Sequence, residues 1–256
     1  MPRSAGRDPS TNTKSAARTL DIFERFALTC RPMTLTELAK ALEIPVSSLF
    51  HLMGTLERRG FAYTLGPRRG FYPTRRMLSF MEMVAANDPL HRLVAPELEA
   101  LRDETGETVV LAQRLEAKAM VLDVFESRHS IRYSAEIGTD RPLHSTAVGK
   151  ALLGAAPREE WDALLGPGPL PKVTETTFTD RAELARELDE SNRRGWFMTR
   201  GENIADVHAI SAVVSLYGQS FAICVAGPHH RFGQQIDSHV AALLARCDRI
   251  RGIPTR

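Results

Sequence analysis

The sequence predicts an α+β protein in which a small helical head precedes a larger domain with an antiparallel-rich sheet. Three segments of helical periodicity and a short hairpin occupy residues 15–74. After residue 105, short apolar runs mix with helical segments without the strict strand–helix–strand alternation of a parallel sheet. The charge is also divided. Residues 1–76 hold 13 Lys and Arg against 6 Asp and Glu, whereas residues 77–256 hold 20 against 25.

The composition fits a globular protein of one large or two modest domains. The 256 residues are 43% hydrophobic and 25% charged, which excludes a disordered chain. No apolar run approaches the ~18 residues of a membrane helix, and residues 1–9 carry no secretory signal. The three cysteines, Cys30, Cys224 and Cys247, lie outside any C-x-x-C pattern. We therefore expect free thiols, a cytoplasmic protein and no membrane partner.

The first elements are predicted from periodicity and capping residues. Residues 1–14 have no periodicity and predict a flexible arm. Apolar residues recur at helical spacing from Ser15 and predict a first helix that ends before residue 31. Either Thr34 or Thr36 caps a short second helix, and Glu37 is the capping-box partner of Thr34.

The next elements complete the head. A third helix is predicted over residues 46–59, with Gly60 as its stop. Residues 61–63 and 71–72 form a small hairpin around the turn at 66–70. Three helices followed by a two-stranded hairpin are the plan of a winged helix-turn-helix, in which the third helix can enter a major groove.

This basic head, residues 15–74, is predicted to bind double-stranded operator DNA. Its cations supply affinity for phosphates, and polar or apolar side chains on the third helix can meet base edges. The alternative is a solvated helix face and a charged turn. The candidate DNA-binding residues are Arg18, Thr34, Ser47, Ser48, Phe50, His51, Thr55, Arg58, Arg68 and Arg69.

Residues 75–88 form a short Met-rich helical stripe interrupted at Asn87-Asp88-Pro89. This pattern predicts a linker helix that also packs against a partner chain. Residues 89–256 then form the second domain, which starts with another helix up to about residue 105. Strands are predicted at 108–112, 120–125, 131–134, 196–199, 210–215 and 221–226, and helices at 145–155, 159–165, 181–194 and 234–251.

A long motif adds a family resemblance. The segment Gly-Thr-Asp-Arg-Pro-Leu-His-Ser-Thr-Ala-Val-Gly-Lys-Ala-Leu-Leu at 138–153 strongly resembles the signature of IclR-type transcriptional regulators. Residues 45–61 resemble that family's recognition helix, and residues 225–231 resemble its closing strand and turn. The resemblance covers about residues 15–250. It implies a homodimer or a tetramer built from dimers, with a GAF-like effector domain that binds a small organic or aromatic acid or a derivative.

The residues themselves suggest how an acid would bind. Ser145 is predicted to cap the helix at 145–155, whose free N–H groups and positive dipole end suit a carboxylate. For Cys224 the alternative is a small buried hydrophobe, and for Glu202 a solvated charge at a strand end. Residue chemistry and the resemblance together give these candidate effector-binding residues: Leu111, Leu143, His144, Ser145, Thr146, Glu202, Val213, Cys224 and Ala226.

Some positions of the predicted recognition helix depart from the family pattern. Val46, Phe50 and His51 stand where relatives commonly carry Lys, His and Arg, so readout of guanine through Arg is less available.

Two other functions are alternatives to a DNA-binding regulator. The pair His144-Ser145 suggests a hydrolase, but there is no G-x-S-x-G elbow, H-E-x-x-H motif or Gly-rich phosphate loop. We therefore expect no enzyme, no metal site and no cofactor. A scaffold protein whose helix-turn-helix only dimerises remains the other alternative.

Overall fold

The computed structural model describes residues 13–66 and 69–254, which form two compact units that meet in sequence between Asp88 and Pro89. Most of the predicted arm, residues 1–12, and the candidate Arg68 lie outside the described residues. Within these ranges no helix is long and apolar enough to span a bilayer.

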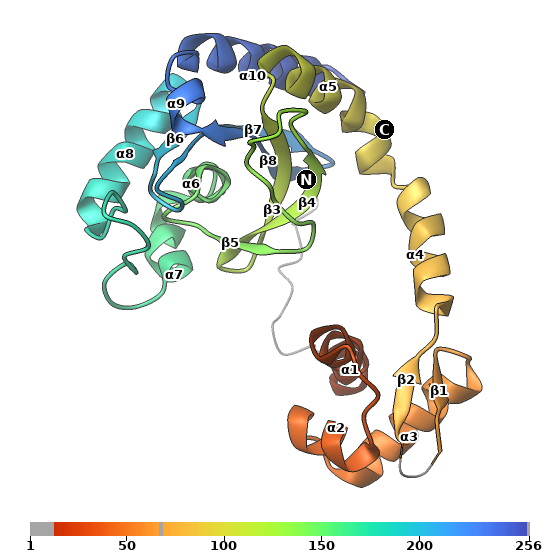
Figure 1. Cartoon of the computed structure of the whole chain (residues 1–256). Helices are drawn as coiled ribbons and strands as arrows, with labels where there is room; N and C mark the ends of the chain where they lie inside the picture. Colours follow the sequence, from red (N-terminus) through yellow and green to blue (C-terminus); the bar gives the residue numbers. More distant parts are fainter. Residues whose placement is uncertain (1–12, 67–68, 255–256) are drawn as a thin grey trace, which may run out of the picture. The chain divides into compact units, whose positions relative to one another are not determined.

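The first unit contains the predicted three helices and hairpin (Figure 1). Ile22, Phe26, Leu38, Leu49 and Met53 from the three helices are buried together in its core. The apolar periodicity therefore gave the correct helix faces. The elements are α1 (Lys14–Thr29), α2 (Leu35–Leu42), α3 (Val46–Arg58), β1 (Ala62–Thr64), β2 (Phe71–Pro73) and α4 (Arg76–Ala86).

A capping box fixes the start of α2. The Thr34 hydroxyl accepts from the Glu37 N–H at 3.2 Å, and the Glu37 carboxylate accepts from the Thr34 N–H at 2.8 Å. This confirms Thr34, rather than Thr36, as the cap. The hairpin is tied to the same point, because the Phe71 N–H donates to the Met33 carbonyl at 2.8 Å.

Helix α4 differs from the other helices in this unit because it buries none of its residues. The Arg76 guanidinium lies over the rings of Phe61 and Phe80, which are themselves stacked. Met77 is half-buried, whereas the other large apolar side chains of α4 are exposed to solvent in the single chain. These are Leu78, Met81, Met83 and Val84, each at least half exposed.

The second unit is built on a six-stranded sheet in the order β5-β4-β3-β8-β7-β6, and each neighbouring pair is antiparallel. This confirms the predicted antiparallel-rich sheet. Its elements are α5 (Pro89–Thr105), β3 (Thr108–Leu115), β4 (Lys118–Phe125), β5 (Asp140–Pro142), α6 (Ala147–Gly154), a 3-10 turn (Arg158–Glu160), α7 (Trp161–Leu165), α8 (Arg181–Arg194), β6 (Phe197–Arg200), β7 (Val207–Leu216), β8 (Gln219–Pro228), α9 (His229–Phe232) and α10 (Ile236–Arg251).

Helices cover both faces of this sheet (Figure 1). Helices α5 and α10 pack on one face, whereas α6 and α8 pack on the other. Successive strand residues alternate between the two cores, so Val109 and Leu111 join the α5–α10 side while Val110 and Ala112 join the α6 side. Both faces of β3 are therefore buried.

One expectation for the strands of this unit was wrong, and two short elements were not predicted. Residues 131–134 do not form a strand, and Ile131 is exposed to solvent. The segment is instead held by its backbone, because the Tyr133 carbonyl accepts from the Thr108 hydroxyl at 2.5 Å. The edge strand is β5, which starts nine residues after Ile131, and neither it nor the short helix α9 was predicted.

Candidate functional site

The first candidate site is the outer face of α3. Leu49, Met53 and Leu56 are buried, and their burial fixes which side of the helix faces solvent. The opposite side presents an unbroken polar and aromatic surface. Its members are Ser47, Phe50, His51, Thr55 and Arg58, all exposed, and Ser48, which is half-buried. Arg58 donates to the Thr55 hydroxyl at 3.3 Å, a contact that leaves most of its donors free for phosphate.

The other candidate DNA-binding residues of the first unit lie in different environments. Arg69, at the described end of the hairpin turn, is exposed, and Arg18 on α1 is half-buried. Thr34 is committed to capping α2, so its hydroxyl already has partners. The structure thus brings the α3 residues together on one face.

The second candidate site is a cavity in the second unit, between the sheet and the start of α6. Its empty volume is about 480 Å³, part of it continuous with solvent. A mostly apolar lining with a few polar groups is typical of sites for small organic molecules. The cavity is lined by Val110, Val121, Tyr133, Arg141, Thr146, Ala147, Val148, Thr199, Asn203, Ile204, Val207, Ala209, Cys224 and Ala226.

The start of α6 forms one cavity wall, and Thr146 is its cap. The Thr146 hydroxyl accepts from the Gly149 N–H at 3.1 Å and donates to the Pro142 carbonyl at 2.7 Å. A Cβ on Gly149 would lie 2.2 Å from that carbonyl, so only glycine fits there. The prediction that Ser145 caps this helix was wrong.

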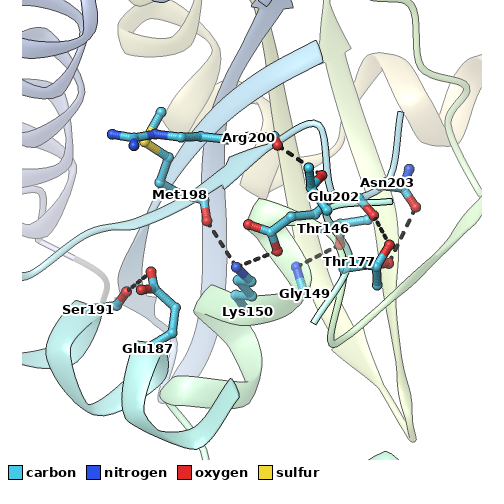
Figure 2. Close-up of polar contacts among 12 residues, drawn as sticks. Thr146, Gly149, Lys150, Thr177, Glu187, Ser191, Met198, Arg200, Glu202 and Asn203 are labelled. Atoms are coloured by element: carbon cyan, nitrogen blue, oxygen red, sulfur yellow. Dashed lines mark hydrogen bonds and ion pairs between the residues drawn. The ribbon is translucent and has the colours of Figure 1, made fainter. Parts of the chain in front are cut away.

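A buried ion pair lies behind the same wall. The Lys150 ammonium is fully buried, 2.5 Å from the Glu202 carboxylate, and donates to the Met198 carbonyl at 3.1 Å. Figure 2 shows Lys150 between these two acceptors. Burial lowers the pKa of Lys150 and raises that of Glu202, and the opposite charge counters each shift. The pair joins α6 to the loop between β6 and β7.

Comparison with known proteins identifies the chain. Residues 83–251 match the family described as Bacterial transcriptional regulator IclR C-terminal, and residues 15–66 match the IclR helix-turn-helix domain. The chain belongs to the IclR family. It is therefore a transcriptional regulator with a helix-turn-helix DNA-binding domain and a C-terminal ligand-binding domain, and not an enzyme.

Individual relatives agree with this assignment. The chain is 27% identical to the transcriptional repressor IclR of Escherichia coli over 90% of its own length and 88% of that protein. It resembles the crystal structure of an IclR regulator from Alicyclobacillus acidocaldarius with a TM-score of 0.78 at 21% identity, covering 94% and 98% of the chains. An IclR homologue from Microbacterium hydrocarbonoxydans, crystallised with 4-hydroxybenzoate, gives a TM-score of 0.75 at 19% identity, covering 93% and 97%.

In this IclR-family chain, three of the predicted effector residues line the cavity: Thr146, Cys224 and Ala226. Burial raises the pKa of the Cys224 thiol to about 12, so the thiol stays neutral and presents a small apolar surface. Cys224 therefore lies in the cavity lining and is at the same time a small buried hydrophobe, so its two predicted interpretations do not exclude each other.

Three consecutive predicted residues lie beside the cavity but do not line it. Leu143 is packed into the α6-side core. The His144 ring is buried and bonds through Nε2 to the Pro171 carbonyl at 2.9 Å, and burial lowers its pKa. The Ser145 hydroxyl is buried 3.4 Å from the side-chain oxygen of Asn203, which does line the cavity.

The remaining three predicted effector residues lie elsewhere. Leu111 points into the core on the opposite face of the sheet, as alternation along β3 requires. Val213 is on the cavity side of β7 but packs further along the strand. Glu202 is neither lining nor solvated, because it is the buried partner of Lys150.

Most of the lining was not predicted, including the polar residues Tyr133, Arg141, Thr199 and Asn203. Arg141 lies inside the 138–153 motif, yet a charged residue one position before Pro142 gives no signal that it is half-buried at a cavity. Burial raises the pKa of the Tyr133 phenol, and the charge of Arg141 partly offsets this rise. Within the described ranges, no three His, Cys, Asp or Glu side chains form a group suited to a metal ion.

Proposed function

We propose that this regulator represses transcription in the cytoplasm by binding operator DNA as a homodimer or a dimer of dimers. We also propose that a small organic or aromatic acid, or a derivative, binds its cavity and controls operator affinity. The observation that carries the proposal is the pairing of an exposed α3 face with a mostly apolar cavity in the second unit. A relative named as a repressor and a structural neighbour holding 4-hydroxybenzoate support it.

The exposed apolar side chains of α4 support an oligomer. A single chain rarely leaves a cluster such as Leu78, Met81, Met83 and Val84 in water, and a second copy would cover it. Pairing two heads also matches the two-fold symmetry of operators read by helix-turn-helix proteins. Sedimentation of the full chain tests this directly, since a monomer at micromolar concentration contradicts it.

DNA binding is tested by gel shift on the region upstream of the protein's own gene over a range of salt concentrations. Replacing Arg58 by Ala should weaken binding at least about tenfold and lower the salt slope by about 1 for each bound head, about 2 for a dimer, because one phosphate contact is lost per head. The matched control is Arg128→Ala, which removes the same charge from an exposed, ion-paired site in the second unit. If the folded protein binds no operator at low salt, the DNA-binding proposal is wrong and the scaffold alternative is favoured.

The effector is sought by a thermal-shift screen of carboxylic acids with their amides, esters and hydrazides. A ligand that binds only the native state stabilises it by RT ln(1 + [L]/Kd), so the unfolding temperature rises with ligand concentration and with affinity. Acids that raise the transition and also change the gel shift support the proposal. Stabilisation with no change in operator affinity contradicts the coupling.

A further inference from the structure

Arg141 differs from the other residues that line the cavity because it is charged. Arg141 is the middle residue of the edge strand β5, where its backbone pairs with Ala119 of β4. Among the described residues that line the cavity, it is the single charged side chain. Its neighbour Asp140 lies outside the lining and pairs with Lys118 at 2.8 Å, so that carboxylate is already engaged.

The Arg141 guanidinium lacks a counterion within the described ranges. Its Nε is buried and has no hydrogen-bond partner. Other arginines of this unit are paired at short distance, as Arg231 is with Glu107 and Arg194 with Glu187. An unpaired buried donor is costly, so a cation left open toward a cavity points to a ligand that completes it.

The rest of the lining limits what that ligand can be. Val121, Ala209, Cys224 and Ala226 give the sheet side an apolar wall that fits a flat hydrocarbon body. No Asp or Glu is among the described lining residues, so nothing there competes for the guanidinium or attracts an amine. The planar Arg fork matches the two oxygens of a carboxylate and offers no comparable pairing to a neutral amide.

We infer that Arg141 determines the specificity of the cavity, selecting the ionised carboxylate of a compact apolar acid over its neutral derivatives. This inference rests on the proposed function, since it assumes that the cavity holds the effector. It decides between the acid and the derivative, which the proposed function leaves open.

The inference is tested by measuring the dissociation constants of benzoate, benzamide and their 4-hydroxy forms by calorimetry with the full chain. The unmodified chain should bind each acid at least tenfold more tightly than its amide. In Arg141→Gln, acid affinity should fall about 10- to 100-fold while amide affinity stays unchanged, because only the charge-assisted bonds are lost. Arg141→Lys keeps the charge but not the planar guanidinium fork, so its acid affinity should lie between those of the unmodified chain and Arg141→Gln.

Arg132→Gln is the matched control. Arg132 precedes the lining residue Tyr133 but is itself exposed and absent from the lining, and it pairs with Glu126 at 2.9 Å. Its replacement by Gln changes the net charge by the same amount as Arg141→Gln. It should leave all four constants unchanged. Equal affinity for acid and amide, or a preference that survives in Arg141→Gln, overturns the role of Arg141 while leaving the effector cavity standing. Binding of neither ligand type by the unmodified chain overturns both this inference and the proposed effector class.

Discussion

Replacing Glu202 by Gln tests the buried ion pair behind the cavity wall. The substitution keeps the side-chain shape and one neutral oxygen acceptor but removes the negative charge beside the fully buried Lys150 ammonium, whose other contacts include the Met198 carbonyl and the Phe178 ring, 4.5 Å away. Breaking a buried pair by removing one partner typically costs about 3–5 kcal/mol. We therefore expect Glu202→Gln to lower the free energy of unfolding by about that amount at pH 7.

The pH dependence gives a sharper test. The variant can escape the buried charge by deprotonating Lys150, whose ordinary pKa is 10.5, at a cost of about 5 kcal/mol at pH 7 and about 2 kcal/mol at pH 9. The pKa of Lys150 in the folded variant then lies below its unfolded value, so the unfolded chain binds the extra proton. The stability of the variant must therefore rise with pH, and its deficit relative to the unmodified chain must shrink.

Tryptophan fluorescence during urea unfolding measures this deficit in the correct unit, because both tryptophans, Trp161 and Trp196, lie in the second unit. The control is the double variant Lys150→Met with Glu202→Leu, which removes both charges and should regain most of the loss. A deficit below about 1 kcal/mol at pH 7 would refute the reasoning, as would a deficit that is the same at pH 7 and pH 9.

Three further predictions concern local structure. Thr34→Ala removes the capping box of α2 and should destabilise the first unit by about 1 kcal/mol in calorimetry; an unchanged transition contradicts the cap. Gly149→Ala should unfold or strongly destabilise the second unit because of its clash with the Pro142 carbonyl, whereas Gly54→Ala, 3.4 Å from the Arg58 side chain, should be neutral or stabilising by up to about 1 kcal/mol. Of the three thiols, Cys30 alone is exposed, so a thiol reagent at pH 8 should label one cysteine quickly in the native chain, and rapid labelling of three would contradict the buried sites.

The head could be predicted from the sequence because its signals are local. Apolar spacing, a Thr–Glu capping box and a glycine stop each specify one short element, and the three helices follow within about two residues. The exposed face of α3 then follows from the burial of Leu49, Met53 and Leu56 on the other side.

The cavity could be predicted only in part because its lining depends on tertiary packing. Both faces of β3 are buried, so no alternation in the sequence tells whether Val110 or Leu111 faces the ligand side. Ser145 and Thr146 are adjacent hydroxyl residues, so the sequence offers two caps for α6. The Thr146 hydroxyl is held by the Pro142 carbonyl four residues earlier and accepts from the Gly149 N–H, so Thr146 is the cap. The position of the half-buried Arg141 in the cavity lining has no local signal at all.

The central claim is that the cavity and the DNA-binding face are coupled in one molecule. The most direct test is to measure operator affinity with and without a saturating acid found by the screen, and acid affinity with and without saturating operator. Thermodynamic linkage requires both affinities to change by the same factor, which we expect to be about 5- to 150-fold. Operator affinity that is unaffected by an acid shown to occupy the cavity would contradict the claim.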